Sequence, residues 1–243
     1  MKRQIGISVI IGLSILALVG TASAGSITEG FEGASYNLAG NGNGTATLST
    51  SVVHSGSQSV ELNLPDTTDY ARVKLDITSY DLTLGQITSA NVWVNKTGSS
   101  EQAPYFLFSI TTPGGGTDTT LAVMYNNPSI PSNGTWYDLT LDTNQMFHVE
   151  GDTTGLTNPS GMTLAQLDSS LYAPGVAWGS LPVDFVRVGA GSAGGGEFLT
   201  AYVDDLTINY TNSPSATPEP SSFLLLGTGV LGLAGAVRRK LLL

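Results

Sequence analysis

The chain has 243 residues, no cysteine and a formal net charge of −10. The lack of cysteine excludes disulfides, thiol catalysis and cysteine-ligated zinc. Between residues 25 and 212 lie eighteen of the acidic residues but only four of the basic ones, so we expect no nucleic acid as a partner of this part.

Residues 1–24 have the segment order of a secretory signal peptide. Lys2 and Arg3 precede an apolar run over residues 5–19, which is followed by Ala22-Ser23-Ala24. The run is short for a bilayer core of about 30 Å, which disfavours the alternative of a permanent transmembrane helix. We therefore expect a signal helix that is removed after export begins.

From residue 25 onwards, short runs of β-branched and aromatic residues alternate with Gly, Pro, Asn and Asp. Several runs, such as residues 58–64 and 71–77, alternate apolar and polar side chains and would bury one face of a sheet. This pattern predicts one all-β domain over residues 25–212, either a sandwich or a barrel. The predicted strands cover residues 45–53, 58–64, 71–77, 87–94, 105–111, 119–125, 135–141, 183–188 and 199–210.

One helical segment is predicted at residues 163–171. Thr163 is suited to cap its first turn, and Leu164, Leu167 and Leu171 would share one side. The segment is too short to change the fold class.

The C-terminal end consists of a linker at residues 213–221 and an apolar segment at 222–243. Its apolar part spans residues 223–237, about 22 Å as a helix, which is marginal for a membrane anchor of about 30 Å. The basic residues after it would stay on the cytoplasmic side. The segment is therefore interpreted as a processed signal that holds the chain in the membrane beforehand, with an ordinary hydrophobic anchor as the alternative.

Three features of this end occur together. Pro218-Glu219-Pro220 precedes a Gly-rich apolar stretch, and Arg238 and Arg239 follow it. In this combination the tail resembles the PEP-CTERM sorting tails of Gram-negative bacteria that make extracellular polysaccharide. The resemblance implies recognition and cleavage by an exosortase-type sorting enzyme, and delivery to the cell envelope, cell surface or extracellular matrix.

The central domain has three weaker resemblances, to the jelly-roll sandwiches of carbohydrate-binding modules and related adhesive domains. Residues 29–33 (Glu-Gly-Phe-Glu-Gly) are similar to their first strand, residues 54–62 (His-Ser-Gly-Ser-Gln-Ser-Val-Glu-Leu) to a turn that enters a strand, and residues 202–208 to their closing strand. Together these segments imply a jelly-roll-type antiparallel β-sandwich.

The same resemblance implies a structural calcium ion that joins the first strand, the turn and the last strand. Calcium takes about six to eight oxygen ligands, which carboxylates and backbone carbonyls can supply. The implied metal residues are Glu32, Ser57, Asp204 and Asp205. The alternative is that these acids are simply solvated, since adjacent residues of a regular strand point to opposite faces.

Aromatic residues are the candidates for sugar contact, because sugar rings stack on exposed aromatic rings. Trp93 lies between two valines and would face away from the core. Trp178 lies in an apparent loop, and Tyr105, Tyr125 and Tyr172 are weaker candidates. Trp136 is expected to pack in the core, and core burial remains an alternative for all of them.

No catalytic constellation is evident in the sequence. The only histidines are His54 and His148, and there is no Gly-X-Ser-X-Gly motif. We expect a non-enzymatic envelope or matrix protein that binds, or is embedded in, extracellular polysaccharide. The alternatives are a structural or adhesive protein that contacts other proteins and, less favoured, a polysaccharide hydrolase or lyase.

Overall fold

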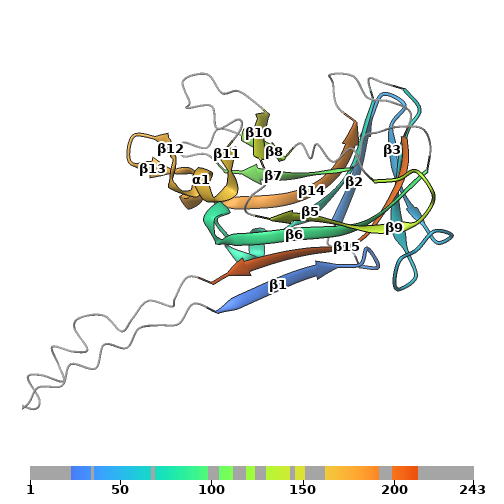
Figure 1. Cartoon of the computed structure of the whole chain (residues 1–243), viewed down its shortest axis with the longest axis horizontal. Coiled ribbons are helices and arrows are strands. Elements are labelled where there is room, and N and C mark those ends of the chain that lie inside the picture. Colours follow the sequence, from blue (N-terminus) through green and yellow to red (C-terminus); the bar gives the residue numbers. More distant parts are fainter. Residues whose placement is uncertain are drawn as a thin grey trace, which may run out of the picture. The chain divides into compact units, whose positions relative to one another are not determined.

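Figure 1 shows the chain as a computed structural model, which describes residues 23–33, 36–66, 69–97, 104–111, 119–123, 130–142, 146–150, 162–191 and 199–212. Residues 1–22 of the predicted signal, the predicted linker and the predicted C-terminal helix lie outside these ranges. Ala24–Asn212 forms one compact unit with its own core. We call this unit the body, and a core of its own is the property that lets a domain fold alone. No helix among the described residues is long and apolar enough to cross a membrane.

The body is built from two antiparallel sheets. The six-stranded sheet has the order β3-β4-β15-β6-β9, and β1 also pairs with β15. Alternate side chains of its central strands point into the space between the sheets, as the period-two pattern requires. The bounds are β1 Ala24–Glu29, β3 Thr45–Ser49, β4 Ser59–Leu64, β6 Ile87–Thr97, β9 Trp136–Asp142 and β15 Leu199–Thr211.

The seven-stranded sheet has the order β11-β10-β8-β7-β14-β5-β2. It lies opposite the first sheet, with β14, β5 and β7 above β6, β15 and β1 in the view of Figure 1. The bounds are β2 Tyr36–Asn41, β5 Tyr70–Asp76, β7 Tyr105–Ile110, β8 Thr119–Val123, β10 Met146–Glu150, β11 Met162–Thr163 and β14 Val183–Gly191.

The core fills the space between the two sheets. Val92, Val94 and Val203 from one sheet, and Val73 and Val188 from the other, are all fully buried. Because the chain has no disulfide, this apolar core and the ladder hydrogen bonds stabilise the body.

One end of the sandwich is covered by short helices and a hairpin. Helix α1 (Leu164–Ser169) begins at Thr163, whose Oγ accepts a hydrogen bond from the Gln166 N–H at 3.2 Å, while Gln166 Oε1 accepts one from the Thr163 N–H at 2.9 Å. The helix packs near the 3₁₀ helices η2 and η3. The remaining elements are η1 Thr78–Tyr80, η2 Leu84–Gln86, β12 Leu171–Ala173, β13 Val176–Ala177 and η3 Trp178–Ser180.

The fold class inferred from the sequence is confirmed, since the described residues form a jelly-roll-type antiparallel β-sandwich. Each predicted strand has a counterpart, and the short helix capped by Thr163 is present, although it ends at Ser169. Strands β1, β2, β10, β11, β12 and β13 were not predicted, because their short, Gly-rich or polar sequences lack clear alternation.

The segment around Phe31 corrects one expectation. Residues 29–33 are not a strand: β1 ends at Glu29, and Phe31 adopts a left-handed conformation with φ 59°. Its ring still enters the core, where it is fully buried and packs edge-on against Tyr36 at a centroid distance of 5.5 Å. The strand ends here because the Glu29 carboxylate accepts the Phe31 N–H at 2.9 Å and so stabilises a turn.

Removing the Phe31 ring tests this anchoring. We expect Phe31→Ala to lower the free energy of unfolding of the body by about 3 to 5 kcal/mol, because it leaves a cavity in a closed core. Urea denaturation followed by tryptophan fluorescence measures the change. Leu48→Ala, at a side chain that is 45% exposed, is the control and should change stability by less than about 1 kcal/mol. Equal effects of the two variants would contradict the assignment of Phe31 to the core.

Candidate functional site

The first candidate site lies where β1 and β4 meet along one edge of β15. Strand β4 pairs with residues 199–203 of β15, and β1 pairs with residues 206–211. Asp204 and Asp205 occupy the gap between them, and the register of β15 against β6 shifts at this point. Asp205 has a φ of 49°, so a bulge replaces regular alternation and lets both side chains reach the same turn.

The Asp204 carboxylate holds the turn that precedes β4. Its Oδ2 accepts hydrogen bonds from the N–H groups of His54 at 2.9 Å and Ser55 at 3.2 Å, and its Oδ1 accepts the Asp205 N–H at 2.8 Å. The residue is fully buried. Burial raises the pKa of Asp204 and the charge of Asp205 acts in the same direction, while the three N–H donors oppose them.

Asp205 binds the side chains of the same turn. Its Oδ2 lies 2.7 Å from His54 Nδ1, and its Oδ1 accepts the hydroxyl of Ser55 at 2.7 Å. Since a carboxylate only accepts, Nδ1 is the protonated ring nitrogen of His54. Two consecutive aspartates therefore fasten one turn, the first through backbone donors and the second through side chains.

Glu32 joins the turn from the other side. Its Oε1 accepts the N–H of Ser57 and lies against Gly56, where a Cβ atom would be 1.7 Å from it. Gly56 also has a φ of 64°, so two independent constraints favour glycine. A Cβ on Gly30 would lie 3.7 Å from Asp205 Oδ1 and 3.8 Å from Glu32 Oε2, which places these two oxygens around one glycine.

The four residues implied as metal ligands thus come together, but they do not play equal parts. Both Asp204 oxygens are occupied by backbone donors, and Ser57 contributes its N–H rather than an oxygen. Glu32 Oε2 and Asp205 Oδ1 are suited to a hard cation, with backbone carbonyls as further donors. Among the described residues, no group of three His, Asp or Glu side chains is arranged to hold a metal.

An aromatic cluster lies beside this turn on the outer side of the six-stranded sheet. The His54 ring stacks on Trp93 with centroids 4.0 Å apart and an interplanar angle of 14°. Trp136 meets the same imidazole edge-on at 5.4 Å. Trp93 is half-buried and faces outwards as expected, but His54 covers one face of its ring. Trp136 is also half-buried there, rather than packed in the core.

Trp178 and Tyr172 do not form an exposed platform. Trp178 belongs to η3 and is fully buried, which corrects the expectation of an exposed loop residue. The half-buried Tyr172 packs edge-on against it at 5.0 Å. The sequence around Trp178 resembles a loop because of its Gly and Pro residues, yet the packed α1, η2 and η3 segments enclose the indole.

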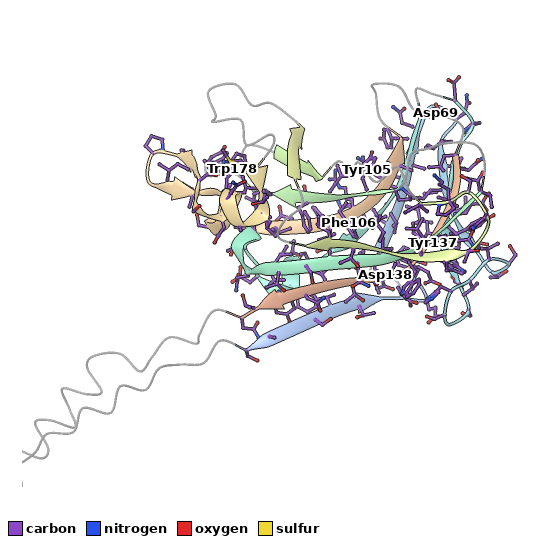
Figure 2. All side chains as sticks on the ribbon, in the orientation of Figure 1. Asp69, Tyr105, Phe106, Tyr137, Asp138 and Trp178 are labelled. Carbon is purple, nitrogen blue, oxygen red and sulfur yellow. The ribbon has the colours of Figure 1, made fainter. Side chains whose placement is uncertain are left out.

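A second surface, which the sequence did not single out, is the outer side of β2, β5, β14 and β7; we call it the cationic face. Figure 2 shows Tyr105 and Phe106 on opposite sides of β7, with Phe106 towards the core. The register places the side chains that share the side of Tyr105 on neighbouring strands. They are Asn37 and Ala39 on β2, Tyr70, Arg72, Lys74 and Asp76 on β5, Phe185, Arg187 and Gly189 on β14, and Tyr105, Leu107 and Ser109 on β7.

Two cations of this face lie over aromatic rings. Lys74 Nζ is 3.3 Å from the centroid of the Phe185 ring, and the Arg72 guanidinium carbon is 4.7 Å from that of Tyr70. An Arg72 nitrogen also donates to the Tyr70 hydroxyl at 3.4 Å. These cation–π contacts hold both side chains along the sheet.

One end of the face forms a recess. An open recess of about 610 Å³ is lined by Tyr36, Asn37, Lys74, Asp76, Thr78, Ser79 and Phe185. Hydrogen bonds from Thr78 to the Asp76 carboxylate, with a smaller effect of Lys74, lower the pKa of Asp76. Further along β14, Gly189 is buried and closely surrounded, because a Cβ there would meet Arg72, Leu107 and Tyr105 at 3.4 Å each.

Comparison with known families identifies the end of the chain. Residues 216–240 match the PEP-CTERM protein-sorting motif. The chain carries a PEP-CTERM sorting tail. The matched residues include Pro218, Glu219, Pro220, Arg238 and Arg239, which fall outside the described residues. Such a tail implies processing by an exosortase and secretion to the cell envelope or surface.

The body of this PEP-CTERM protein is similar in fold to carbohydrate-binding modules. The family 11 module of the cellulosomal cellulase Lic26A-Cel5E of Clostridium thermocellum has 13% identity and a TM-score of 0.49, over 76% of this chain and 95% of that one. The CBM22-1 xylan-binding domain of Paenibacillus barcinonensis Xyn10C has 13% identity and a TM-score of 0.43, over 77% and 94%. No curated protein sequence matches this chain.

Asp204→Asn tests the fastening of the turn. An amide must present NH₂ where the carboxylate accepts N–H groups, so we expect unfolding free energy to fall by about 2 to 3 kcal/mol. Thermal and urea unfolding of the body measure it. Asp138→Asn, at an exposed carboxylate of β9 that accepts only the neighbouring Thr140 hydroxyl, is the matched control and should be nearly neutral. A neutral Asp204→Asn would show that the turn is held by other contacts.

Proposed function

We propose that this PEP-CTERM protein is a non-enzymatic, exported polysaccharide-binding protein whose ligand lies along the cationic face. The observation that carries the proposal is the row of half-buried aromatic rings, Tyr70, Tyr105 and Phe185, on one outer sheet face beside an open recess. Rings and flanking polar groups on a rigid sheet are suited to an extended sugar chain, since stacking needs apolar ring surface and hydroxyls need donors and acceptors.

The alternating pattern of the strands supports this choice of face. The register places Arg72 and Tyr105 on either side of Gly189, on the neighbouring strands. The recess beside Phe185 is open rather than closed. An open site fits a polymer better than a small molecule, because a polymer can continue past it.

The chemistry of the face favours binding without catalysis. On the register positions of β2, β5, β14 and β7, Asp76 is the single carboxylate, and Asp184, in the irregular start of β14, already accepts the hydroxyl of Thr111. Glycoside hydrolysis requires two carboxyl groups about 5 to 10 Å apart across the scissile bond. The proposal therefore assigns binding, and no reaction, to this face.

The sorting tail supports the location of the proposed ligand. Secretion to the envelope or surface brings the body into contact with extracellular polysaccharide, and the apolar segment after the Pro-Glu-Pro motif would hold the chain in the membrane until an exosortase processes it. We propose the cell surface or extracellular matrix as the final site of the body.

Binding to a panel of neutral and charged soluble polysaccharides tests the proposal. Affinity electrophoresis of the body should show retardation by at least one polysaccharide, and Phe185→Ala should weaken this binding about tenfold or more, because it removes one of the three aromatic rings of the proposed contact. Trp93→Ala, on the other sheet, tests the competing aromatic site. The melting temperature of each variant shows whether it remains folded.

Two results would contradict the proposal. Loss of binding in Trp93→Ala but not in Phe185→Ala would move the site to the six-stranded sheet. A folded body that binds no polysaccharide would favour a structural or adhesive surface protein that contacts other proteins.

We also propose that Glu32 and Asp205 hold a structural calcium ion next to the turn at residues 54–57. At a calcium concentration about one hundred times Kd, binding would stabilise the body by about 2.7 kcal/mol, which is about 5 to 10 °C in Tm. Differential scanning fluorimetry with calcium and with a chelator measures this shift. Glu32→Gln should abolish it, and Glu61→Gln, elsewhere on the same sheet, should retain it. An identical Tm with calcium and with chelator would rule out the ion.

A further inference from the structure

The two outer faces of the sandwich differ in charge. Three of the four cations of the body, Arg72, Lys74 and Arg187, lie on the cationic face, and the fourth, Lys96, is buried. On the strands of the six-stranded sheet, the outward register positions carry Glu61 and Asp138 and no cation. A body with many more acids than bases has therefore gathered its accessible positive charge on one surface.

This arrangement is unfavourable for folding by itself. Lys74 and Arg187 are directly opposite each other on β5 and β14, where like charges repel. Arg72 is two residues from Lys74 on the same side of β5, about 7 Å away along the strand. Within the described part of the chain, neither Arg72 nor Lys74 forms an ion pair with a carboxylate closer than 4 Å. Such a gathering of like charges on one face is typical of a binding site.

The aromatic contacts keep these charges available. Lys74 over Phe185 and Arg72 over Tyr70 are held in place by the rings, and a ring does not neutralise the charge as a carboxylate would. The planar guanidinium of Arg72 can still donate two parallel hydrogen bonds to a ligand carboxylate. Aromatic rings and cations thus lie side by side on one surface.

From this charge pattern we infer that the ligand of the cationic face is an acidic polysaccharide that carries carboxylates along its chain, as uronic acid polymers do. The inference rests on the proposed glycan binding and specifies its substrate class. Sugar rings would stack on Tyr105 and Tyr70, and carboxylates would meet Arg72 and Lys74. The acidic remainder of the body disfavours polymers with denser charge, such as nucleic acids, because they extend beyond the cationic face into a repulsive field.

A matched pair of ligands tests the inference. Isothermal titration calorimetry compares the binding of the body to polygalacturonate and to its methyl ester, which keeps the sugar backbone but removes the charge. We expect the acid form to bind about tenfold tighter or more, since each charge-assisted hydrogen bond is lost in the ester. Raising the salt concentration from about 0.1 M to about 1 M, which shortens the Debye length from about 10 Å to about 3 Å, should weaken the binding of the acid form alone.

A matched pair of variants locates the effect. Arg72→Gln with Lys74→Gln should remove the preference for the acid form. Ser26→Glu with Thr45→Glu, at exposed positions of the six-stranded sheet, changes the net charge by the same amount and should retain the preference. Unchanged melting temperatures confirm that all proteins are folded.

Each outcome separates the two proposals. Equal binding of acid and ester, sensitive to Phe185→Ala, would overturn the acidic ligand and keep glycan binding. No binding of either form or of the wider panel would overturn both. Tighter binding of dextran sulfate or single-stranded DNA than of polygalacturonate would show a general polyanion surface and overturn the assignment of a carboxylated glycan. An equal loss in both double variants would show an effect of net charge alone.

Discussion

The long ladder of β15 is the constraint on which the rest of the body depends. This strand pairs with β6 along one edge and with β4 and then β1 along the other, so it joins segments from both ends of the body. Without disulfides, these pairings and the apolar side chains beneath them must hold the ends of the domain together. The bulge at Asp204 and Asp205 lies on that edge between the residues that pair with β4 and those that pair with β1. It places two carboxylates against the turn at residues 54–57. Position 204 is occupied by an acid because its carboxylate accepts hydrogen bonds from the backbone N–H groups of His54 and Ser55.

Strand alternation explains the separation of charge across the sandwich. Because successive residues point to opposite sides, the inner positions of β5 supply Ala71, Val73 and Leu75 to the core, while its outer positions supply the cations. The same rule on β6 buries Val92 and Val94 and turns Trp93 outwards towards His54. The two outer faces therefore share a scaffold but differ in chemistry, one with aromatic and cationic residues and the other with acids and the fastened turn. A single domain of this size can thus combine a fastened turn on one side with the proposed binding surface on the other.

The resemblance in sequence singled out four residues that meet at one turn, where Asp204 and Ser57 form hydrogen bonds that involve backbone N–H groups. Glu32, Ser57, Asp204 and Asp205 do converge, although a regular strand would have separated the two aspartates. The left-handed conformation of Asp205 resolves this conflict, and no sequence rule predicted it, because aspartate adopts that conformation only where tertiary contacts support it. For Trp178 the local sequence was misleading, since burial of its indole depends on helices from three separate segments. In the sequence, the cationic face was visible only as polar and aromatic residues that alternate with apolar ones along one predicted strand. These residues are Tyr70, Arg72, Lys74 and Asp76. Its meaning required knowledge of the strands beside it.

The sequence by itself determined the properties that depend on short stretches of chain. These are the sorting motif at residues 216–240, the all-β class of the body, most of its strands and the cap of helix α1. Each of them follows from composition, period or a contiguous motif. Only the tertiary structure decided which strands are neighbours, and hence that Arg187 lies opposite Lys74, that β1 and β4 leave a gap for Asp204, and that Trp178 is enclosed. The reason is physical: pairing partners lie far apart in the chain, and the free energy that selects them comes from burying both sheets together rather than from any local preference.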